Sequence, residues 1–253
     1  MRVLALDTTT PAGSVALVDE EGVTDERRGD SSRTHAARLP AEVLALLDAR
    51  GLAVSDVDLF AVASGPGSFT GLRIGIATIQ GLASVHRRRV VGVPALAALA
   101  QIAGATRAPD TIVGVWMDAH RREVFSARYR VTGAAPFTPG RLVEIEEPIV
   151  GDPAAILARW AGTDVPSVFA GDGAAVYGAL IRASVPQAEM VGETPMAGAI
   201  GRLAIAHALA GETVDPAGLR AVYVRRPDAE IALEKRSLIA RDAKDAKDAK
   251  DNN

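Results

Sequence analysis

Short apolar runs and turn-forming residues alternate at the start of the chain. Residues 2–7 and 14–18 are rich in Val, Leu and Ala, and the segment between them reads TTTPAG. Runs of this length and composition are typical of β-strands, and Thr, Pro and Gly are typical of turns. The pattern therefore predicts a β-hairpin with Asp7 at its tip.

The segment after this hairpin predicts a helix, a strand and a second helix. Residues 35–50 carry apolar side chains at helical spacing, with Pro40 either near the start of that helix or at a kink in it. Residues 58–67 form an apolar run that leads into a glycine-rich turn, which predicts a buried strand. Residues 69–85 continue from the turn with helical periodicity.

The second half of the chain repeats this order. Residues 111–119 and 123–131 predict another hairpin, with Asp118 near its tip. Residues 166–181 read as a strand, a Gly-Asp-Gly turn and a helix, and residues 196–211 predict a further apolar helix. Two units in the same order suggest a duplicated α/β architecture.

The same pattern divides the chain into two lobes and a tail. We expect a first lobe over residues 1–106 and a second over 107–225, with the helix at 196–211 able to pack back on the first lobe. Residues 226–253 contain the charged repeat DAKDAKDAKD, which has almost nothing to bury, and we expect this tail to be disordered.

The glycine-rich turn, SGPGSFTGLRIGIATIQG at residues 64–81, matches neither common phosphate-binding pattern. A P-loop needs Gly-Lys-Ser/Thr, but Gly71 is followed by Leu72 and no lysine is near. The dinucleotide pattern needs a third glycine where Thr70 stands. An anion at the start of the helix stays open as a weaker alternative, because helix N-termini favour anions in general. We expect these glycines to serve packing.

The helix that follows the turn carries few polar side chains. Only Arg73 and Gln80 form a polar line, while Gly71 and Gly75 lie one turn apart and would let another backbone approach closely. A surface helix normally shows water a wide polar side. The helix is therefore either central in its own domain or covered on one side by another protein, and we favour the second alternative.

Composition and charge narrow the function classes. The net charge of −3 and the pI near 5.9 argue against a free-standing nucleic-acid binder. The chain has no cysteine, which excludes a disulfide framework, thiolate metal sites and a cysteine nucleophile. Asp7 interrupts the N-terminal apolar run, and no later window approaches ~18 uninterrupted apolar residues, so we expect a cytoplasmic protein without a membrane span.

No catalytic or metal-binding constellation stands out. The four histidines lack the spacing of an imidazole metal site. Asp7 and Asp118 could hold a Mg²⁺–phosphate complex between two lobes, but an Asp more commonly caps its own turn, and we favour capping. We assign no catalytic residue, metal or cofactor. The residues that would contact a cofactor, if one bound, are Asp7, Thr9, Asp118, Gly171 and Gly173.

Five segments occur in an order that identifies a family. They are LALDTTTPAGSVAL, SGPGSFTGLRIGIATIQGLA, MDAHRREVF, GDGA and YVRRPDAE. Together they resemble the TsaB (YeaZ) family over roughly residues 1–230. The resemblance implies an α/β fold of two RNase H-like lobes of the actin/Hsp70/sugar-kinase (ASKHA) type, with mixed sheets and flanking helices. One departure is Ala221-Val222-Tyr223, where relatives commonly place a proline before the tyrosine.

The resemblance also implies a function and partners. The family supplies a non-catalytic scaffold to TsaD, which transfers a threonylcarbamoyl group to the adenosine 3′ of the anticodon in tRNAs that read codons beginning with A. It further implies TsaE in a larger assembly, a homodimer in isolation, and tRNA as the substrate of the complex. Carried onto this chain, the interface would lie on the helices at 35–50 and 69–85, with the anchors Leu39, Val43, Leu46, Phe69, Leu72, Arg73, Ile76 and Ile79.

Two enzymatic alternatives stay open beside this interpretation. The same fold also carries nucleotide-dependent phosphotransferases and ATPases, and fold alone does not choose between these functions. A proteolytic activity has been attached to the superfamily by name, but the sequence shows no catalytic group for it.

Overall fold

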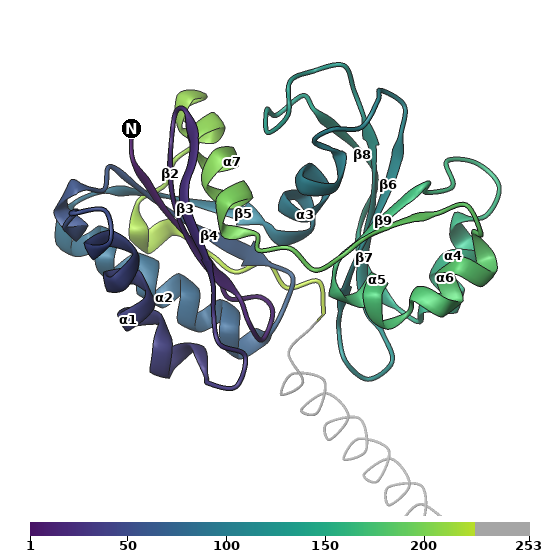
Figure 1. The fold of residues 1–253 in the computed structure, drawn as a ribbon, viewed down its shortest axis with the longest axis horizontal. Coiled ribbons are helices and arrows are strands. Elements are labelled where there is room, and N and C mark those ends of the chain that lie inside the picture. The colour runs from purple at the N-terminus through teal and green to yellow at the C-terminus, as the bar shows by residue number, and fades with distance from the viewer. Residues whose placement is uncertain (226–253) are drawn as a thin grey trace, which may run out of the picture.

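Two five-stranded sheets form the two lobes of the chain (Figure 1). The structure is a computed structural model that describes residues 1–225, so the predicted tail at 226–253 lies outside the described residues. The first sheet has the order β3-β2-β1-β4-β5, with β1 (Val3–Asp7), β2 (Ser14–Asp19), β3 (Gly22–Arg28), β4 (Leu59–Gly65) and β5 (Arg89–Pro94). The second has the order β10-β9-β6-β7-β8, with β6 (Ile112–Asp118), β7 (Val124–Val131), β8 (Leu142–Gly151), β9 (Val168–Ala170) and β10 (Glu189–Val191).

The strand directions are the same in both sheets. β1 runs antiparallel to β2 and parallel to β4, and β6 correspondingly runs antiparallel to β7 and parallel to β9. Each sheet is thus a hairpin meander extended by parallel strands, as in an RNase H-like lobe. The predicted duplication and the predicted fold class, two mixed sheets with flanking helices of the ASKHA type, are confirmed.

Two long helices cover one face of the first sheet. They are α1 (His35–Asp48) and α2 (Phe69–His86), which lie side by side in Figure 1. Their bounds agree with the predicted helices, and Pro40 lies inside α1, so the helix starts before the proline rather than at it. Short 3₁₀ turns at Val54–Asp56 and Pro216–Gly218 lie beside α2.

The second sheet carries shorter helices on its corresponding side. They are α4 (Pro153–Trp160), α5 (Asp172–Val176) and α6 (Gly178–Ser184). The sequence predicts one helix after the Gly-Asp-Gly turn, whereas the structure has two that meet at Tyr177. Under them, the rings of Trp116, Trp160 and Phe169 fill the core.

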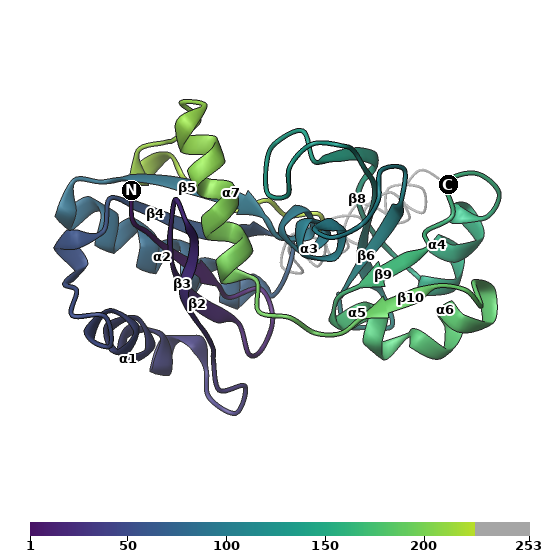
Figure 2. The ribbon, with the colours of Figure 1, turned by 45° about the horizontal axis from the view of Figure 1, so that its top comes forward.

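The two remaining helices cross between the lobes. α3 (Ala95–Gly104) follows β5 of the first sheet but contacts β6, β7, β8 and β9 of the second, while α7 (Ala197–Leu209) follows β10 but packs on β1, β2 and β4. α3 and α7 also contact each other, and Figure 2 shows both between the sheets. Each lobe therefore takes a helix from the other half of the chain.

The N-terminus of α7 is fixed to the first sheet by hydrogen bonds. Ser14 Oγ accepts from the backbone amides of Met196 at 3.1 Å and Ala197 at 2.9 Å, and Glu26 Oε1 accepts from the amide of Gly198 at 2.8 Å. These bonds satisfy donors that a helix start leaves without intrahelical partners.

Among the helices of residues 1–225, none combines the length and the apolar composition that a membrane span requires.

Candidate functional site

The glycines of the glycine-rich segment at residues 64–81 lie against the turn that joins β1 to β2. A Cβ on Gly71 would come within 2.0 Å of the Thr8 carbonyl oxygen, and one on Gly75 within 2.2 Å of Thr8 Oγ1. A Cβ on Gly67 would come within 2.5 Å of the Cβ of Thr9. Only glycine lets two segments approach this closely. The predicted packing role of these glycines is confirmed, and the backbone that approaches them belongs to the same chain.

Hydrogen bonds within the chain also occupy the start of α2. Ser68 Oγ accepts from the amide of Gly71 at 3.2 Å, and the amide of Ser68 donates to the carbonyl of Thr9 at 2.9 Å. A serine N-cap of this kind satisfies one of the amides that a bound anion would otherwise use.

The two acidic hairpin tips cap their own turns. Asp7 Oδ1 accepts from the amide of Thr9 at 2.8 Å and from Thr9 Oγ1 at 2.6 Å. Asp118 Oδ1 accepts from the amide of His120 at 2.9 Å. Both carboxylates thus make the turn-capping bonds favoured by the sequence.

The second glycine turn packs against β6 in a similar way. A Cβ on Gly171 would come within 2.1 Å of the Trp116 carbonyl oxygen. Asp172 Oδ1 accepts from the amides of Asp118 at 3.0 Å and Gly173 at 2.8 Å. The five residues named as possible cofactor contacts therefore lie at corresponding ends of the two lobes, in contacts within the chain. That no cofactor binds there stays a prediction.

Cavities between the lobes adjoin these turns. One of about 880 Å³ is lined by Thr9, Asp118 and Asp172, among others, and one of about 350 Å³ by Asp7, Gly171 and Asp172. In residues 1–225 there is no group of three or more His, Cys, Asp or Glu side chains that could hold a metal ion.

Burial perturbs the carboxyl groups that face this space. Asp7 is 3% exposed, and burial raises its pKa to about 6 despite the hydrogen bonds from Thr9. The charge of Asp172 adds to this rise. Burial also raises the pKa of Asp172, against the amides that donate to it. A low-polarity environment disfavours the ionised form of each carboxyl.

Most of the predicted interface anchors lie on the inner side of their helices. Those buried in the core beneath α1 and α2 are Leu39, Val43, Leu46, Leu72, Ile76 and Ile79. Phe69 is 38% exposed and Arg73 is also exposed. The six buried side chains fill the space between the helices and their own sheet, so they are not available on the surface of the single chain. The interface itself stays a prediction.

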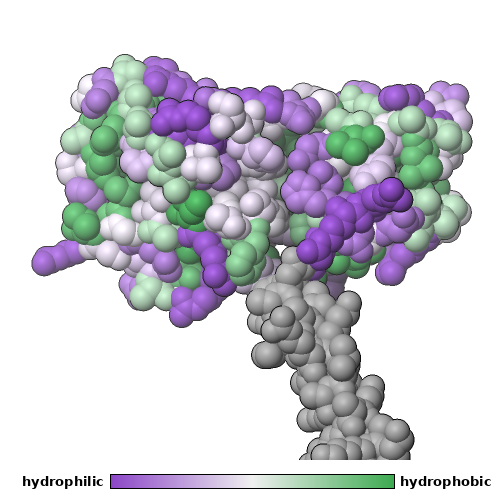
Figure 3. All heavy atoms as spheres, turned by 90° about the horizontal axis from the view of Figure 1, so that it is seen from below, coloured by the Kyte–Doolittle hydropathy of each residue, from purple (hydrophilic) through white to green (hydrophobic). Residues whose placement is uncertain are grey.

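The outward side of the same two helices is nearly free of charge. Every exposed position of α1 between Ala36 and Ala45 is Ala, Pro or Leu, and Leu44 is 54% exposed. The exposed positions of α2 include Ala77, Gly81 and Val85 beside Arg73. Figure 3 shows hydrophobic and near-neutral patches among hydrophilic ones on this lobe, at the left. We call the exposed residues of α1 and α2 the outer helix face.

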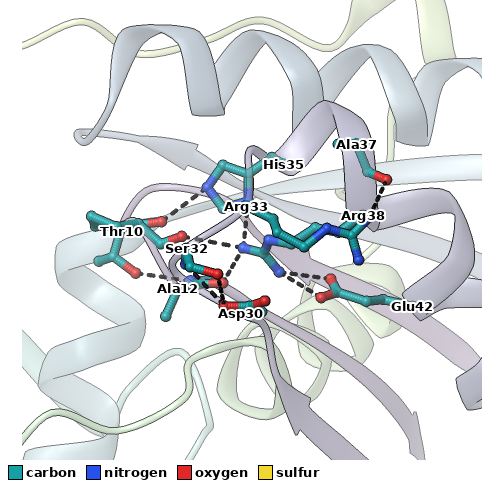
Figure 4. Close-up of polar contacts among 11 residues, drawn as sticks. Thr10, Ala12, Asp30, Ser32, Arg33, His35, Ala37, Arg38 and Glu42 are labelled. Carbon is teal, nitrogen blue, oxygen red and sulfur yellow. Dashed lines mark hydrogen bonds and ion pairs between the residues drawn. The ribbon is translucent and has the colours of Figure 1, made fainter.

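A buried arginine, which the sequence analysis does not single out, ties α1 to the β1–β2 turn (Figure 4). Arg38 is 2% exposed, and its Nη2 donates to the carbonyls of Pro11 at 3.2 Å and of Ala12. Its Nη1 donates to both carboxylate oxygens of Glu42 at 2.7 Å. Arg38 and Glu42 are four residues apart on α1, a spacing that the sequence does show.

His35 completes this connection as a neutral imidazole. Its Nδ1 lies 2.8 Å from Nη2 of Arg38, which can only donate, and its Nε2 lies 3.0 Å from the carbonyl oxygen of Thr10. Nδ1 must therefore accept and Nε2 must carry the proton. Burial, and then the Arg38 charge, lower the pKa of His35.

Comparison with known proteins assigns the family. A family model described as TsaD, tRNA N6-adenosine threonylcarbamoyltransferase, matches residues 29–213. The solved structure of YeaZ from Pseudomonas aeruginosa is 32% identical to this chain, with 88% of this chain and 99% of that one covered and a TM-score of 0.71. The chain belongs to the TsaB/YeaZ family.

Two further relatives are matched over only part of their own length. The Escherichia coli tRNA threonylcarbamoyladenosine biosynthesis protein TsaB is 40% identical over 51% of this chain and 55% of its own length. An uncharacterized protein of Mycobacterium leprae is 34% identical over 90% of this chain and 56% of its own. The chain thus spans about half the length of these curated relatives.

The contact between α2 and the β1–β2 turn predicts opposite effects of two glycine substitutions. Gly71→Ala should destabilise this family member by about 1–3 kcal/mol, because the new methyl group must displace the Thr8 carbonyl. Gly81→Ala should stabilise it by up to ~1 kcal/mol, since no described atom lies within 4 Å of the added Cβ. Urea denaturation measures both, and equal midpoints for the two variants would contradict the packing role.

The raised pKa of Asp7 predicts a pH-dependent gain in stability for Asp7→Asn. The folded chain binds the proton of Asp7 more tightly than the unfolded chain does, so protonation of Asp7 stabilises the fold. This stabilisation is complete below pH 3.8 and is lost as the pH rises through about 6. The variant keeps the acceptor oxygen and should therefore be more stable than the parent at pH 7 by up to about 3 kcal/mol, a difference that shrinks toward pH 4.

Asp19→Asn is the matched control for this prediction. The Thr24 hydroxyl lowers the pKa of Asp19, so the stability that its ionised form contributes is present above pH 3.8. Asp19→Asn should therefore bring no gain at pH 7. Thermal unfolding between pH 4 and pH 8 makes the comparison, and a pH-independent difference for Asp7→Asn would refute the assignment.

Proposed function

We propose that the chain is a non-catalytic scaffold subunit of tRNA threonylcarbamoyladenosine biosynthesis that binds TsaD through the outer helix face. The names of the TsaB relatives and the match to the TsaD family model support the pathway. On this proposal the complex works on tRNA in the cytoplasm, TsaE joins a larger assembly, and the chain alone forms a homodimer.

The observation that carries the proposal is the composition of α1. A helix at a protein surface normally exposes charged and polar side chains, yet every exposed position of α1 between residues 36 and 45 is Ala, Pro or Leu, and the partly buried Glu42 is paired with Arg38. An apolar face of this kind usually marks a partner surface. The small side chains of Ala41, Ala77 and Gly81 would also let a helix of a partner approach closely.

The non-catalytic role is supported by what the conspicuous residues already do. The glycines at 67, 71 and 75 accommodate the β1–β2 turn, and Asp7 and Asp118 cap their turns. Residues that might have suggested chemistry in the sequence are therefore explained by packing and capping.

A nucleotide-dependent phosphotransferase or ATPase is the second candidate, and the cavity of about 880 Å³ between the lobes favours it. We expect the isolated chain not to hydrolyse ATP. Isothermal titration of the chain with Mg²⁺–ATP, combined with a phosphate-release assay, distinguishes the two functions. Saturable binding that disappears in Asp7→Ala, with ATP turnover, would favour the second.

The scaffold proposal predicts that a charge on the outer helix face weakens TsaD binding. Leu44→Glu should raise the Kd at least about tenfold, or ~1.4 kcal/mol, because the carboxylate would be buried without a partner. Leu44 is 54% exposed in the single chain, so the substitution should leave the fold intact. Ile76 is a poor choice, because it is 8% exposed and a charge there would disrupt the core of the chain itself.

Val143→Glu is the matched control, since Val143 is 53% exposed on β8 of the other lobe. It should bind TsaD like the parent chain. In cells depleted of the chain, the parent and Val143→Glu should restore threonylcarbamoyladenosine in tRNA, measured by nucleoside mass spectrometry, and Leu44→Glu should not. Unchanged levels of the modified nucleoside after depletion would refute the function.

A further inference from the structure

The chain after α7 returns along the first lobe. Val214 pairs with Val90 at the edge of β5, with N···O distances of 2.9 and 3.0 Å. Gln80 Nε2 of α2 donates to the carbonyl of Pro216 at 2.8 Å, and Leu219 is buried in the core beneath α2. The segment is therefore anchored to the first lobe before it reaches the cavity between the lobes.

The four residues Val222–Arg225 begin on the first lobe. The amide of Val222 donates to the carbonyl of Ser64 at 2.7 Å. The ring of Tyr223 lies 5.2 Å from that of Phe69, between centroids, on the first turn of α2, and the guanidinium of Arg73 lies 4.0 Å from the Phe69 centroid. Tyr223 thus adjoins the outer helix face.

Arg225, two residues later, contacts the second lobe. Its Nη1 donates to the carbonyl of Ala119 at 2.7 Å, and its Nη2 forms an ion pair with Glu123. The guanidinium also lies 5.6 Å from the ring centroid of Phe125. A four-residue segment therefore holds both lobes.

The β6–β7 turn, which Arg225 contacts, has an unfavourable backbone conformation. His120, Arg121 and Arg122 have φ angles of 57°, 55° and 64°, three consecutive left-handed residues that are not glycine. Such residues persist only where surrounding contacts hold them. Ala119 and Glu123 flank the three, and Arg225 contacts both, so its bonds brace the turn from each end.

The position of the segment relative to the crossing helices gives these contacts a role. α3 and α7 join the lobes on one side, whereas the segment crosses between them near the hairpin turns at the lower side of Figure 1. Val222–Arg225 also line the cavity of about 880 Å³. The crossing helices can act as a hinge, and the segment closes the opposite side.

We propose that Val222–Arg225 is a clasp that sets how far the two lobes open and that couples this opening to the outer helix face. A partner seated against Phe69 displaces Tyr223, which pulls Arg225 from the β6–β7 turn and lets the cavity widen. The clasp stands on the contacts above, while the coupling to a partner rests on the proposed function.

Paired spin labels test the clasp in the full chain without a partner. The chain has no cysteine, so introduced cysteines are the only labelling sites. Ser31→Cys and Val176→Cys place one label on each lobe, at residues that line the cavity of about 880 Å³. Arg225→Met should move the distance distribution to longer values and broaden it. Arg220→Met is the matched control, because Arg220 donates to the carbonyls of Ala217 and Leu219 in its own segment. Identical distributions for parent, Arg225→Met and Arg220→Met would overturn the clasp.

Hydrogen exchange provides a second readout of the same contact. The Ala119 amide donates to the Glu123 carbonyl at 3.0 Å, and the Glu123 amide to the His120 carbonyl at 3.0 Å. Both amides should exchange at least about tenfold faster in Arg225→Met, because the turn loses a charge-assisted brace. Amides of α1 should be unchanged, and faster exchange throughout the chain would indicate general destabilisation and count against the clasp.

Addition of TsaD to the labelled chain tests the coupling. The parent distribution should shift toward that of Arg225→Met, and the variant should show no further shift. TsaD that binds without moving the labels would overturn the coupling and leave the clasp intact. Absence of any TsaD binding would remove the proposed function and the coupling together, while the comparison without partner still decides the clasp.

Discussion

The packing of two helices on one turn is the constraint on which the first lobe depends. The turn between β1 and β2 contacts α2 at Thr8, where the space at Gly71 and Gly75 is too small for any side chain. The carbonyls of Pro11 and Ala12, farther along the same turn, accept hydrogen bonds from Arg38 of α1. Both helices are thus attached to one turn, in addition to their contact with each other and with the core beneath them, and the turn contributes to their relative position. Residues outside the outer helix face therefore contribute to its shape.

The two lobes share a strand order but use it differently. In the second lobe the glycine turn leads into helices of five and seven residues, whereas α1 and α2 have 14 and 18. Two long helices side by side can present a continuous face, which two short helices that meet at Tyr177 cannot. The aromatic cluster of Trp116, Trp160 and Phe169 instead gives the second lobe a core of large rings. The two lobes therefore share one sheet topology, and the length of their helices distinguishes the surfaces that they present.

The elements of this fold are predictable from the sequence, while the orientation of their faces is less so. Periodicity locates α1, α2 and both hairpins, because apolar side chains must alternate or recur with the geometry of the element. The same periodicity marks the inner face of a helix, which is why Leu39, Leu72 and Ile79 are in the core. A partner surface is better sought among the positions between them, where Ala, Pro and Leu replace the charged residues that water would favour. Contacts such as Arg38 with Ala12 join segments that only the tertiary fold brings together, so no local pattern predicts them.

The exchange of α3 and α7 restricts how the lobes can move. A boundary near residue 106 follows the order of the chain, but the packing does not, since α3 contacts the second sheet and α7 the first. Separation of the lobes would break the contact between α3 and α7 and expose the apolar side chains that pack there. A pivot about these helices leaves that core intact. On the clasp proposal, the lobes open on the side away from these helices, where both hairpin turns line the cavity. Contacts on that side then have the largest effect on the distance between the lobes.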